Sequence, residues 1–69
     1  DLFFRYENVV YIVDYKTDKK IEKGRYERQL SVYKKAVQDL WQHKYPDEKV
    51  EFKTFLFYLH LDKAIECFC

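Results

Sequence analysis

A carboxylate and an amine stand two residues apart in the stretch YIVDYKTD, residues 11–18. The stretch has the β-branched and aromatic composition of a β-strand, and side chains two positions apart on a strand lie on the same face. Asp14 and Lys16 therefore share a face with Ile12, an apolar residue. A charge on a face that packs into a core is unfavourable unless it is paired or takes part in chemistry. The strand thus predicts either an ion pair or a catalytic site.

A second carboxylate, that of Asp1, is predicted to lie beside Asp14. Residues 1–6 and 9–16 both have strand composition. Glu7 and Asn8 between them suit a two-residue hairpin turn, because Asn tolerates positive φ. In such a hairpin Phe3 pairs with Ile12, and Asp1 lies opposite Asp14 with Cβ atoms about 4.5–5.5 Å apart.

Two carboxylates at that separation repel each other unless a cation lies between them. A hard divalent ion, Mg²⁺ or Mn²⁺ in its place, prefers such oxygen ligands, and the backbone carbonyl of Tyr15 can add another. Lys16 would then position the attacking water or neutralise charge on a phosphate. The cluster predicts metal-assisted hydrolysis of a phosphodiester. The alternative is that Asp14 and Lys16 form an ion pair on the exposed face of an antiparallel sheet.

An amphipathic helix is predicted from about residue 25 to 44, before Pro46. Its apolar residues recur at steps of three and four: Tyr26, Leu30, Tyr33, Val37, Leu40 and Trp41. Gln29 interrupts the stripe, and Tyr26, Gln29 and Tyr33 lie on one helical face. A buried amide needs hydrogen-bond partners, so we expect Gln29 to face the site with Tyr33 beside it. The alternative is that both tyrosines are core residues.

Residues 48–61, EKVEFKTFLFYLHL, predict a third strand with two apolar faces, which is typical of a central strand. One face is expected to carry Phe55, Phe57, Leu59 and Leu61, and the other Leu56 and Tyr58. Asp62 and Lys63 are predicted to turn the chain into a last strand, residues 64–69. The element order is β-β-α-β-β, and the helical connection between the second and third strands predicts a mixed sheet. The predicted class is α/β.

The composition is that of a small folded domain: 69 residues, of which 48% are apolar and 20% aromatic. Thirteen basic and twelve acidic residues give a net charge of +1, which excludes a basic tail but not a local cationic groove. Basic residues gather between the second strand and the helix, and they are predicted either to approach DNA phosphates or to be ordinary surface charge. They are Lys19, Lys20, Lys23, Arg25 and Arg28.

No apolar run approaches membrane-spanning length. Cys67 and Cys69 are two positions apart on a predicted strand, so they point the same way and are poorly placed for a disulfide. These features predict a reducing, cytoplasmic setting.

The motifs together resemble the RecB-type nuclease domain of the PD-(D/E)xK superfamily, which lies at the C-terminus of RecB and AddA helicase–nucleases. In that family an Asp often followed by Leu is a metal ligand, as in Asp1-Leu2. A hydrophobic-Asp-Tyr-Lys-Thr strand supplies the second ligand and the lysine, as in residues 13–17. A Gln-x-x-x-Tyr motif on the next helix matches Gln29 and Tyr33. The resemblance covers nearly the whole chain.

The resemblance implies a restriction-endonuclease-like mixed sheet that lacks its N-terminal helix and part of its first strands. Residues 1–69 would be one partial nuclease domain of a longer bacterial-type protein. That parent protein would be a Mg²⁺-dependent deoxyribonuclease that works in DNA-end processing and recombinational repair, with a helicase and a second subunit. Because the upstream metal ligand is missing, the metal site is predicted to be incomplete and the isolated chain inactive. Because part of the first strands is missing too, the chain is predicted to have an open sheet edge through which it can self-associate.

Roles for individual residues follow from the same resemblance. It implies catalysis by Asp1, Asp14, Lys16 and Gln29. It implies metal binding by Asp1, Asp14 and the Tyr15 carbonyl. It implies that Gln29 and Tyr33 orient the site or contact the DNA. Lys19, Lys20 and Arg25 are predicted to contact DNA because of their position between the second strand and the helix. Two alternatives are a nuclease-fold module that binds DNA or a partner subunit without cutting, and a small junction-resolving or restriction-type nuclease.

Overall fold

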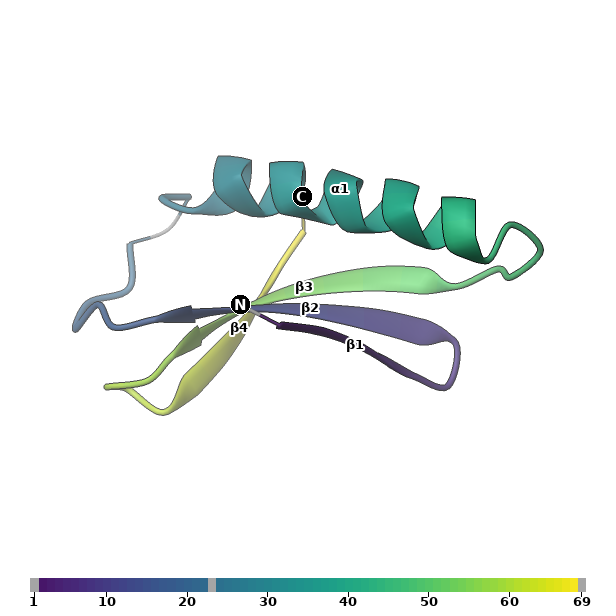
Figure 1. The fold of residues 1–69 in the computed structure, drawn as a ribbon. Helices are drawn as coiled ribbons and strands as arrows, with labels where there is room; N and C mark the ends of the chain where they lie inside the picture. Colours follow the sequence, from purple (N-terminus) through teal and green to yellow (C-terminus); the bar gives the residue numbers. More distant parts are fainter. Residues whose placement is uncertain (1, 23, 69) are drawn as a thin grey trace.

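A four-stranded sheet lies under a helix that covers one of its faces (Figure 1). The computed structural model describes residues 2–22 and 24–68. Within this part the element order β-β-α-β-β is as predicted. The elements are β1 (Leu2–Tyr6), β2 (Val9–Lys16), α1 (Glu27–Lys44), β3 (Glu51–Tyr58) and β4 (Lys63–Cys67).

The sheet is mixed, with the strands in the spatial order β1-β2-β3-β4. The β1–β2 and β3–β4 pairs are antiparallel, and α1 connects the parallel pair β2–β3. The prediction of a mixed α/β sheet is confirmed, and so is the central position of the third strand. The parallel pairing follows from the helical connection, because such a crossover brings the next strand back in the same direction. The central position of the third strand follows from its two apolar faces.

The predicted hairpin register is confirmed at each end of the described pairing, where Tyr6 lies opposite Val9 and Leu2 opposite Val13. The turn itself differs from the prediction, because Glu7, with φ 55°, is the turn residue in the left-handed region, and not Asn8. A positive φ in a two-residue turn is typical of the tight turns that join hairpin strands. The Nε of Arg5 donates to the Glu7 carbonyl at 2.7 Å, which helps to hold this conformation.

The helix begins at Glu27, two residues later than predicted, with Tyr26 as a cap residue whose side chain makes no capping bond. Leu30 and Val37 are buried, as the apolar stripe predicts. Leu40 is 55% exposed, so its predicted place in the core is wrong. At about 100° per residue, Leu40 lies about 80° around the axis from Leu30, beyond the strip that contacts the sheet.

The third strand is shorter than the predicted range 48–61, because it pairs with β2 only as far as Lys16 opposite Tyr58. Leu59 and Leu61 therefore lie in the following turn and are exposed, which corrects their predicted place on a strand face. Asp62, with φ 49°, completes this turn. The last strand already begins at Lys63 and ends at Cys67, and not over residues 64–69.

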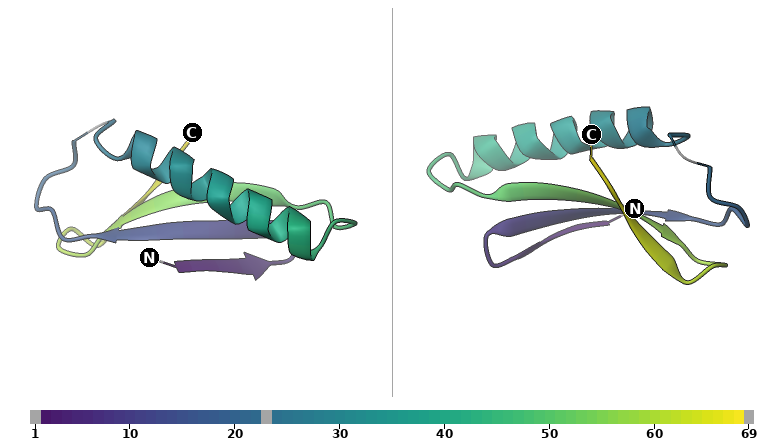
Figure 2. Two further views of the ribbon diagram at one scale, coloured as in Figure 1. Left: turned by 45° about the horizontal axis from the view of Figure 1, so that its top comes forward. Right: turned by 180° about the vertical axis from the view of Figure 1, so that it is seen from behind.

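The core lies between the sheet and α1, which crosses the sheet obliquely (Figure 2). The buried apolar side chains of the described residues form two clusters, one at each end of the helix. They are Val10, Ile12 and Val37 in one cluster, and Leu30, Leu56 and Tyr58 in the other. Among the described residues, no helix combines the length and the apolarity needed to cross a bilayer.

Candidate functional site

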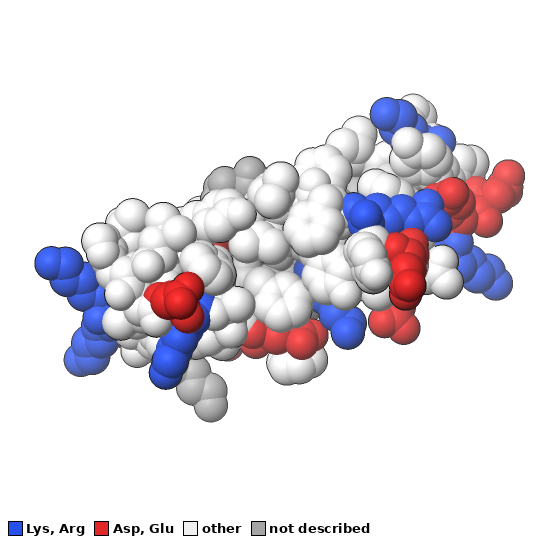
Figure 3. All heavy atoms as spheres, turned by 90° about the horizontal axis from the view of Figure 1, so that it is seen from below, with Lys and Arg blue, Asp and Glu red and all other residues white. Residues whose placement is uncertain are grey.

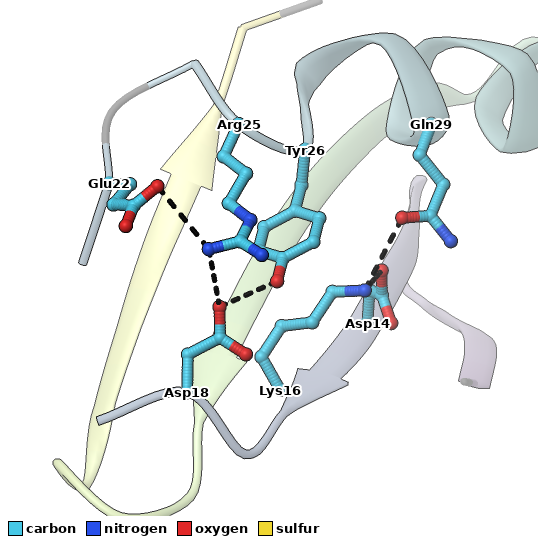
Figure 4. Close-up of polar contacts among 7 residues, drawn as sticks. All are labelled: Asp14, Lys16, Asp18, Glu22, Arg25, Tyr26 and Gln29. Atoms are coloured by element: carbon cyan, nitrogen blue, oxygen red, sulfur yellow. Dashed lines mark hydrogen bonds and ion pairs between the residues drawn. The ribbon is translucent and has the colours of Figure 1, made fainter. Parts of the chain in front are cut away.

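Asp14 lies on β2 with its side chain towards α1, in the same series as the buried residues Val10 and Ile12. The residue is 3% exposed, and its Oδ2 lies 3.0 Å from the Nζ of Lys16 (Figure 4). The ion pair of the alternative interpretation therefore exists. Its predicted location is wrong, because the pair lies on the helix-covered face of the sheet. An ion pair there is screened far less by water than a surface pair.

The ammonium of Lys16 has two further contacts, both with the start of α1. Its Nζ donates to the Oε1 of Gln29 at 3.3 Å and lies 4.0 Å from the ring centroid of Tyr26. A cation at that distance is attracted by the face of an aromatic ring. Asp14, Gln29 and Tyr26 together hold the Lys16 ammonium in one position.

Gln29 is exposed as a residue, so the prediction of a buried amide is wrong. Its carbonyl oxygen nevertheless points at Lys16, as Figure 4 shows. The residue immediately next to it, Leu30, is fully buried. Gln29 thus lies at the border of the buried stripe, where one end of the amide contacts the site and the rest of the side chain meets solvent.

Asp18, which lies beyond the end of β2, was not among the predicted site residues. The hydroxyl of Tyr26 donates to Asp18 Oδ2 at 2.5 Å, and the guanidinium of Arg25 lies 3.8 Å from the same oxygen. Arg25 also pairs with Glu22 at 3.3 Å. A signal was present in the sequence, because Asp18 continues the even-numbered series of Ile12, Asp14 and Lys16. Asp18 anchors Tyr26 and so fixes the ring that contacts Lys16.

These contacts change the proton affinities of the groups around the site. The pKa of Tyr26 is raised, chiefly because its hydroxyl donates to the Asp18 carboxylate and secondly because of burial. The pKa of Arg25 is raised by Tyr26, Glu22 and Asp18, in that order. Burial is the main cause of the raised pKa of Tyr58. Tyr26 and Tyr58 are therefore neutral phenols, and Arg25 is a cation, at neutral pH.

Tyr33 does not join this group of residues. It packs against the buried cluster formed by Val10, Ile12 and Val37, as the alternative interpretation of a core aromatic predicts. The reason is helical geometry, because Tyr33 lies a full turn beyond Gln29 along the axis, over the middle of the sheet.

The predicted DNA-contacting cations are placed unevenly. Lys19 and Lys20 are exposed in the segment that leads from β2 to α1. Arg25 is half exposed, and its guanidinium already contacts the carboxylates of Glu22 and Asp18. Lys23 lies outside the described residues. Of the described cations in this segment, Lys19 and Lys20 are thus the best placed to meet an external phosphate.

The predicted metal site depends on Asp1, which lies outside the described residues. Leu2, the first residue described, pairs with Val13. Within residues 2–22 and 24–68, no three His, Cys, Asp or Glu side chains gather to hold a metal ion. The carboxylate of Asp14 is nonetheless a hard oxygen ligand of the kind that Mg²⁺ prefers.

The backbone carbonyl of Tyr15 has a direction that follows from the strand pairing. The carbonyl of Lys16 accepts from the N–H of Leu59 at 2.9 Å, towards β3. Successive carbonyls of a strand alternate in direction, so that of Tyr15 points towards the β1 side. The described pairing of β1 ends at Val13, so the Tyr15 carbonyl lies beyond the β1–β2 ladder. A carboxylate and a carbonyl are oxygen donors of the type that hard cations accept, and the predicted third ligand, Asp1, lies outside the described residues.

Comparisons of the chain with protein-family models, with curated proteins and with solved structures found no match. The function of the site is therefore inferred from its chemistry. That chemistry is a buried carboxylate beside an ammonium, with the amide of Gln29 and the ring of Tyr26 fixing the ammonium in place.

Proposed function

We propose that this chain is part of a metal-dependent deoxyribonuclease of the RecB/AddA type, with the central sheet of a restriction-endonuclease-like fold. The observation that supports the proposal best is the contact of Lys16 with both Asp14 and Gln29. Asp14 and Lys16 belong to the strand motif, and Gln29 belongs to the helix motif of that nuclease family. Three of the residues that carry the resemblance are thus joined by polar contacts on one side of the sheet.

In this proposal Asp14, the Tyr15 carbonyl and Asp1 would hold Mg²⁺. The bound ion would supply positive charge that polarises the scissile phosphate and its attacking water. Lys16 donates a hydrogen bond to a phosphate oxygen or to the water. Its positive charge stabilises the negative charge that develops in the transition state. Such a donor is most effective when it is oriented before the reaction begins.

The neighbours of Lys16 provide that orientation. Gln29 and the ring of Tyr26 hold the ammonium from the helix side, and Tyr26 is itself anchored by Asp18. Without substrate, Asp14 and Lys16 neutralise each other at 3.0 Å, so that neither charge is left without a partner at a site shielded from water. Gln29, Tyr26 and Asp18 are accordingly positioning residues in this proposal.

DNA is inferred as the substrate from the family resemblance and from the positive charge of exposed lysines near the site. DNA would reach the site across the exposed Lys19 and Lys20, whose side chains can contact backbone phosphates. Action on DNA ends beside a helicase and a second subunit is the setting that the RecB/AddA resemblance implies.

A competing function is a nuclease-fold module that binds DNA or a partner subunit without cutting. One observation favours it: the Asp14 carboxylate is already paired with Lys16, and no second metal-binding acid joins it among the described residues. The two functions differ in whether Asp14 and Lys16 are needed for strand cleavage.

The test is Mg²⁺-dependent degradation of linear duplex DNA by the intact protein that contains these residues. Asp14→Ala and Lys16→Ala are each expected to lower the rate at least about a hundredfold, as for the loss of one group that stabilises transition-state charge. Lys35→Ala, on the exposed side of α1, is the control and is expected to cut like wild type. Circular dichroism checks that each variant is folded.

Two results would count against the nuclease assignment. If folded Asp14→Ala and Lys16→Ala variants degrade DNA as fast as wild type, the catalytic roles are wrong. If the wild type binds labelled DNA in a fluorescence-polarisation assay but leaves it intact with Mg²⁺ or Mn²⁺, the non-cutting module is the function.

A further inference from the structure

A cavity of about 410 Å³ opens between the start of α1 and the last strand, β4. It lies on the helix side of the sheet, away from the sheet face that Figure 3 shows with uncharged surface across its middle. Its apolar walls include Leu56 of β3 and Ile65 of β4. Cavities that bind small ligands have volumes of roughly 300–1,000 Å³. The cavity therefore has room for a planar ring system.

Two tyrosines join this cavity to Lys16. Tyr26 lines the cavity, and its ring centroid lies 4.0 Å from the Nζ of Lys16 (Figure 4). Tyr58 also lines the cavity, and it lies directly opposite Lys16 in the β2–β3 ladder. A phosphate held at Lys16 would carry a nucleotide on each side, so one neighbouring base would come within reach of the cavity.

The hydroxyl of Tyr58 is a polar group on the floor of the cavity. Tyr58 is fully buried, and its hydroxyl has no hydrogen-bond partner among the described residues. The pKa of Tyr58 is raised chiefly by burial, and then by Asp18 of the site and by Cys67 of the cavity lining. The hydroxyl therefore lies near both the site and the cavity. A buried hydroxyl without a partner lowers stability, and a bound ligand with an acceptor atom would satisfy it.

The charges at the mouth of the cavity indicate what kind of ligand fits. The exposed residues Glu22 and Glu27 line the mouth, and Glu22 also pairs with Arg25 at 3.3 Å. Two carboxylates disfavour a phosphate there and favour an uncharged ligand that donates hydrogen bonds. The amino group of cytosine is a donor that carboxylates accept. Thymine has a carbonyl oxygen in place of that amino group, so it fits this mouth less well.

We propose that the cavity binds an unpaired base of the DNA strand next to the phosphate at Lys16, and that it favours bases with an exocyclic amino group, such as cytosine. The base would pack on Tyr26 and the apolar walls, accept a hydrogen bond from Tyr58 and donate its amino hydrogen towards Glu27. Proteins that hold unpaired bases combine such packing with hydrogen bonds to the base edge. The inference rests on the proposed function, which supplies DNA as the ligand.

Photo-crosslinking of the intact protein in the presence of EDTA tests this proposal without any need for cleavage. The probes are two short single-stranded oligonucleotides, one of 5-iodocytosine and one of 5-iodouracil nucleotides. Peptide mass spectrometry locates the crosslinks. We expect a crosslink at Tyr26 whose half-maximal probe concentration is about fivefold lower for the cytosine probe, the effect of one hydrogen bond.

Tyr58→Phe removes only the hydroxyl, and it should stay folded because that hydroxyl has no partner among the described residues. The variant is expected to raise the half-maximal concentration of the cytosine probe about fivefold. Tyr45→Phe makes the same change at the far end of α1, where the Tyr45 ring contacts Trp41. This control is expected to crosslink like wild type.

Three outcomes would overturn the proposal. The first is the absence of crosslinks at the residues that line the cavity. The second is an equal half-maximal concentration for the two probes. The third is a folded Tyr58→Phe variant that crosslinks like wild type. Each of them leaves the nuclease assignment in place if the protein still degrades DNA. Conversely, base-selective crosslinks at Tyr26 in a protein that leaves DNA intact with Mg²⁺ would refute cleavage but support the base-binding cavity.

Discussion

Replacement of Lys16 by Met tests whether Lys16 alone offsets the energetic cost of burying the Asp14 carboxylate. At 3.0 Å and an effective dielectric constant of 20, the attraction of the pair is about 5.5 kcal/mol before desolvation is subtracted. The variant keeps the apolar stem and leaves the Asp14 side chain, which is 4% exposed, without a cation among the described residues. Breaking a buried pair in this way lowers stability by about 3–5 kcal/mol. Because the Lys16 side chain is 15% exposed and water can enter from its end, we expect about 3 kcal/mol.

That loss is large for a chain of this length, whose total stability is expected to be about 3–10 kcal/mol. The loss in the free energy of unfolding is measured by urea unfolding. Circular dichroism and the fluorescence of Trp41, the single tryptophan, monitor the transition. In a thermal scan the melting temperature should fall by about 12–24 °C. Lys35→Met, an equivalent change on the exposed side of α1, is expected to change the stability by less than about 0.5 kcal/mol.

A double-mutant cycle gives the sharpest refutation. Asp14→Asn should lower the stability of the wild type by about 1 kcal/mol, since the Lys16 ammonium that remains is less buried than Asp14 and keeps its contacts with Gln29 and Tyr26. In the Lys16→Met background the same change should raise the stability, because it removes an unpaired carboxylate. Equal destabilisation in both backgrounds, or a loss below about 1 kcal/mol for Lys16→Met alone, would show that Lys16 does not hold the Asp14 charge.

Three further predictions concern the core and its tyrosines. Tyr58 is fully buried, and its hydroxyl has no hydrogen-bond partner among the described residues, so Tyr58→Phe should raise the free energy of unfolding by about 1 kcal/mol in urea. Tyr26 and Tyr58 have pKa values raised above the ordinary 10.0. Their contribution to stability is therefore constant below about pH 10, and it is lost as the pH rises through the folded pKa values, because the unfolded phenols ionise first. Urea unfolding at about pH 9 and pH 11 should show this loss, and Tyr58→Phe should show less of it. Leu30→Ala should lower stability by about 2–5 kcal/mol, whereas Leu40→Ala, at a residue 55% exposed, should lower it by less than about 1 kcal/mol in the same assay.

Local pattern was sufficient to predict the elements and most of their pairing. Alternation along residues 9–16 placed Asp14 and Lys16 on one face, and the two-residue turn set the register of β1 against β2. The helical connection between the second and third strands predicted a crossover and a mixed sheet, and the two apolar faces of β3 indicated its central place. These are properties of neighbouring residues and of chain length, which the sequence contains directly.

The ends of the elements depended on partners. β3 stops at Tyr58 because β2 stops at Lys16, so Leu59 and Leu61 are turn residues despite their apolar alternation. Glu7 takes the left-handed turn conformation in place of Asn8. A hairpin's twist decides which turn position needs positive φ, and composition decides only which residues tolerate it.

The sequence by itself determined that Asp14 and Lys16 share a face and that Gln29 lies on the next helix. Only the tertiary structure decided that this face is covered by α1, that Gln29 and Tyr26 contact Lys16 while Tyr33 packs in the core, and that Asp18 anchors Tyr26. The physical reason is that helical periodicity specifies directions around an axis, whereas the contact made at each level depends on where the helix crosses the sheet. That crossing is set by the packing of Leu30 on Leu56 and Tyr58 and of Val37 on Val10 and Ile12, all of which are distant in sequence.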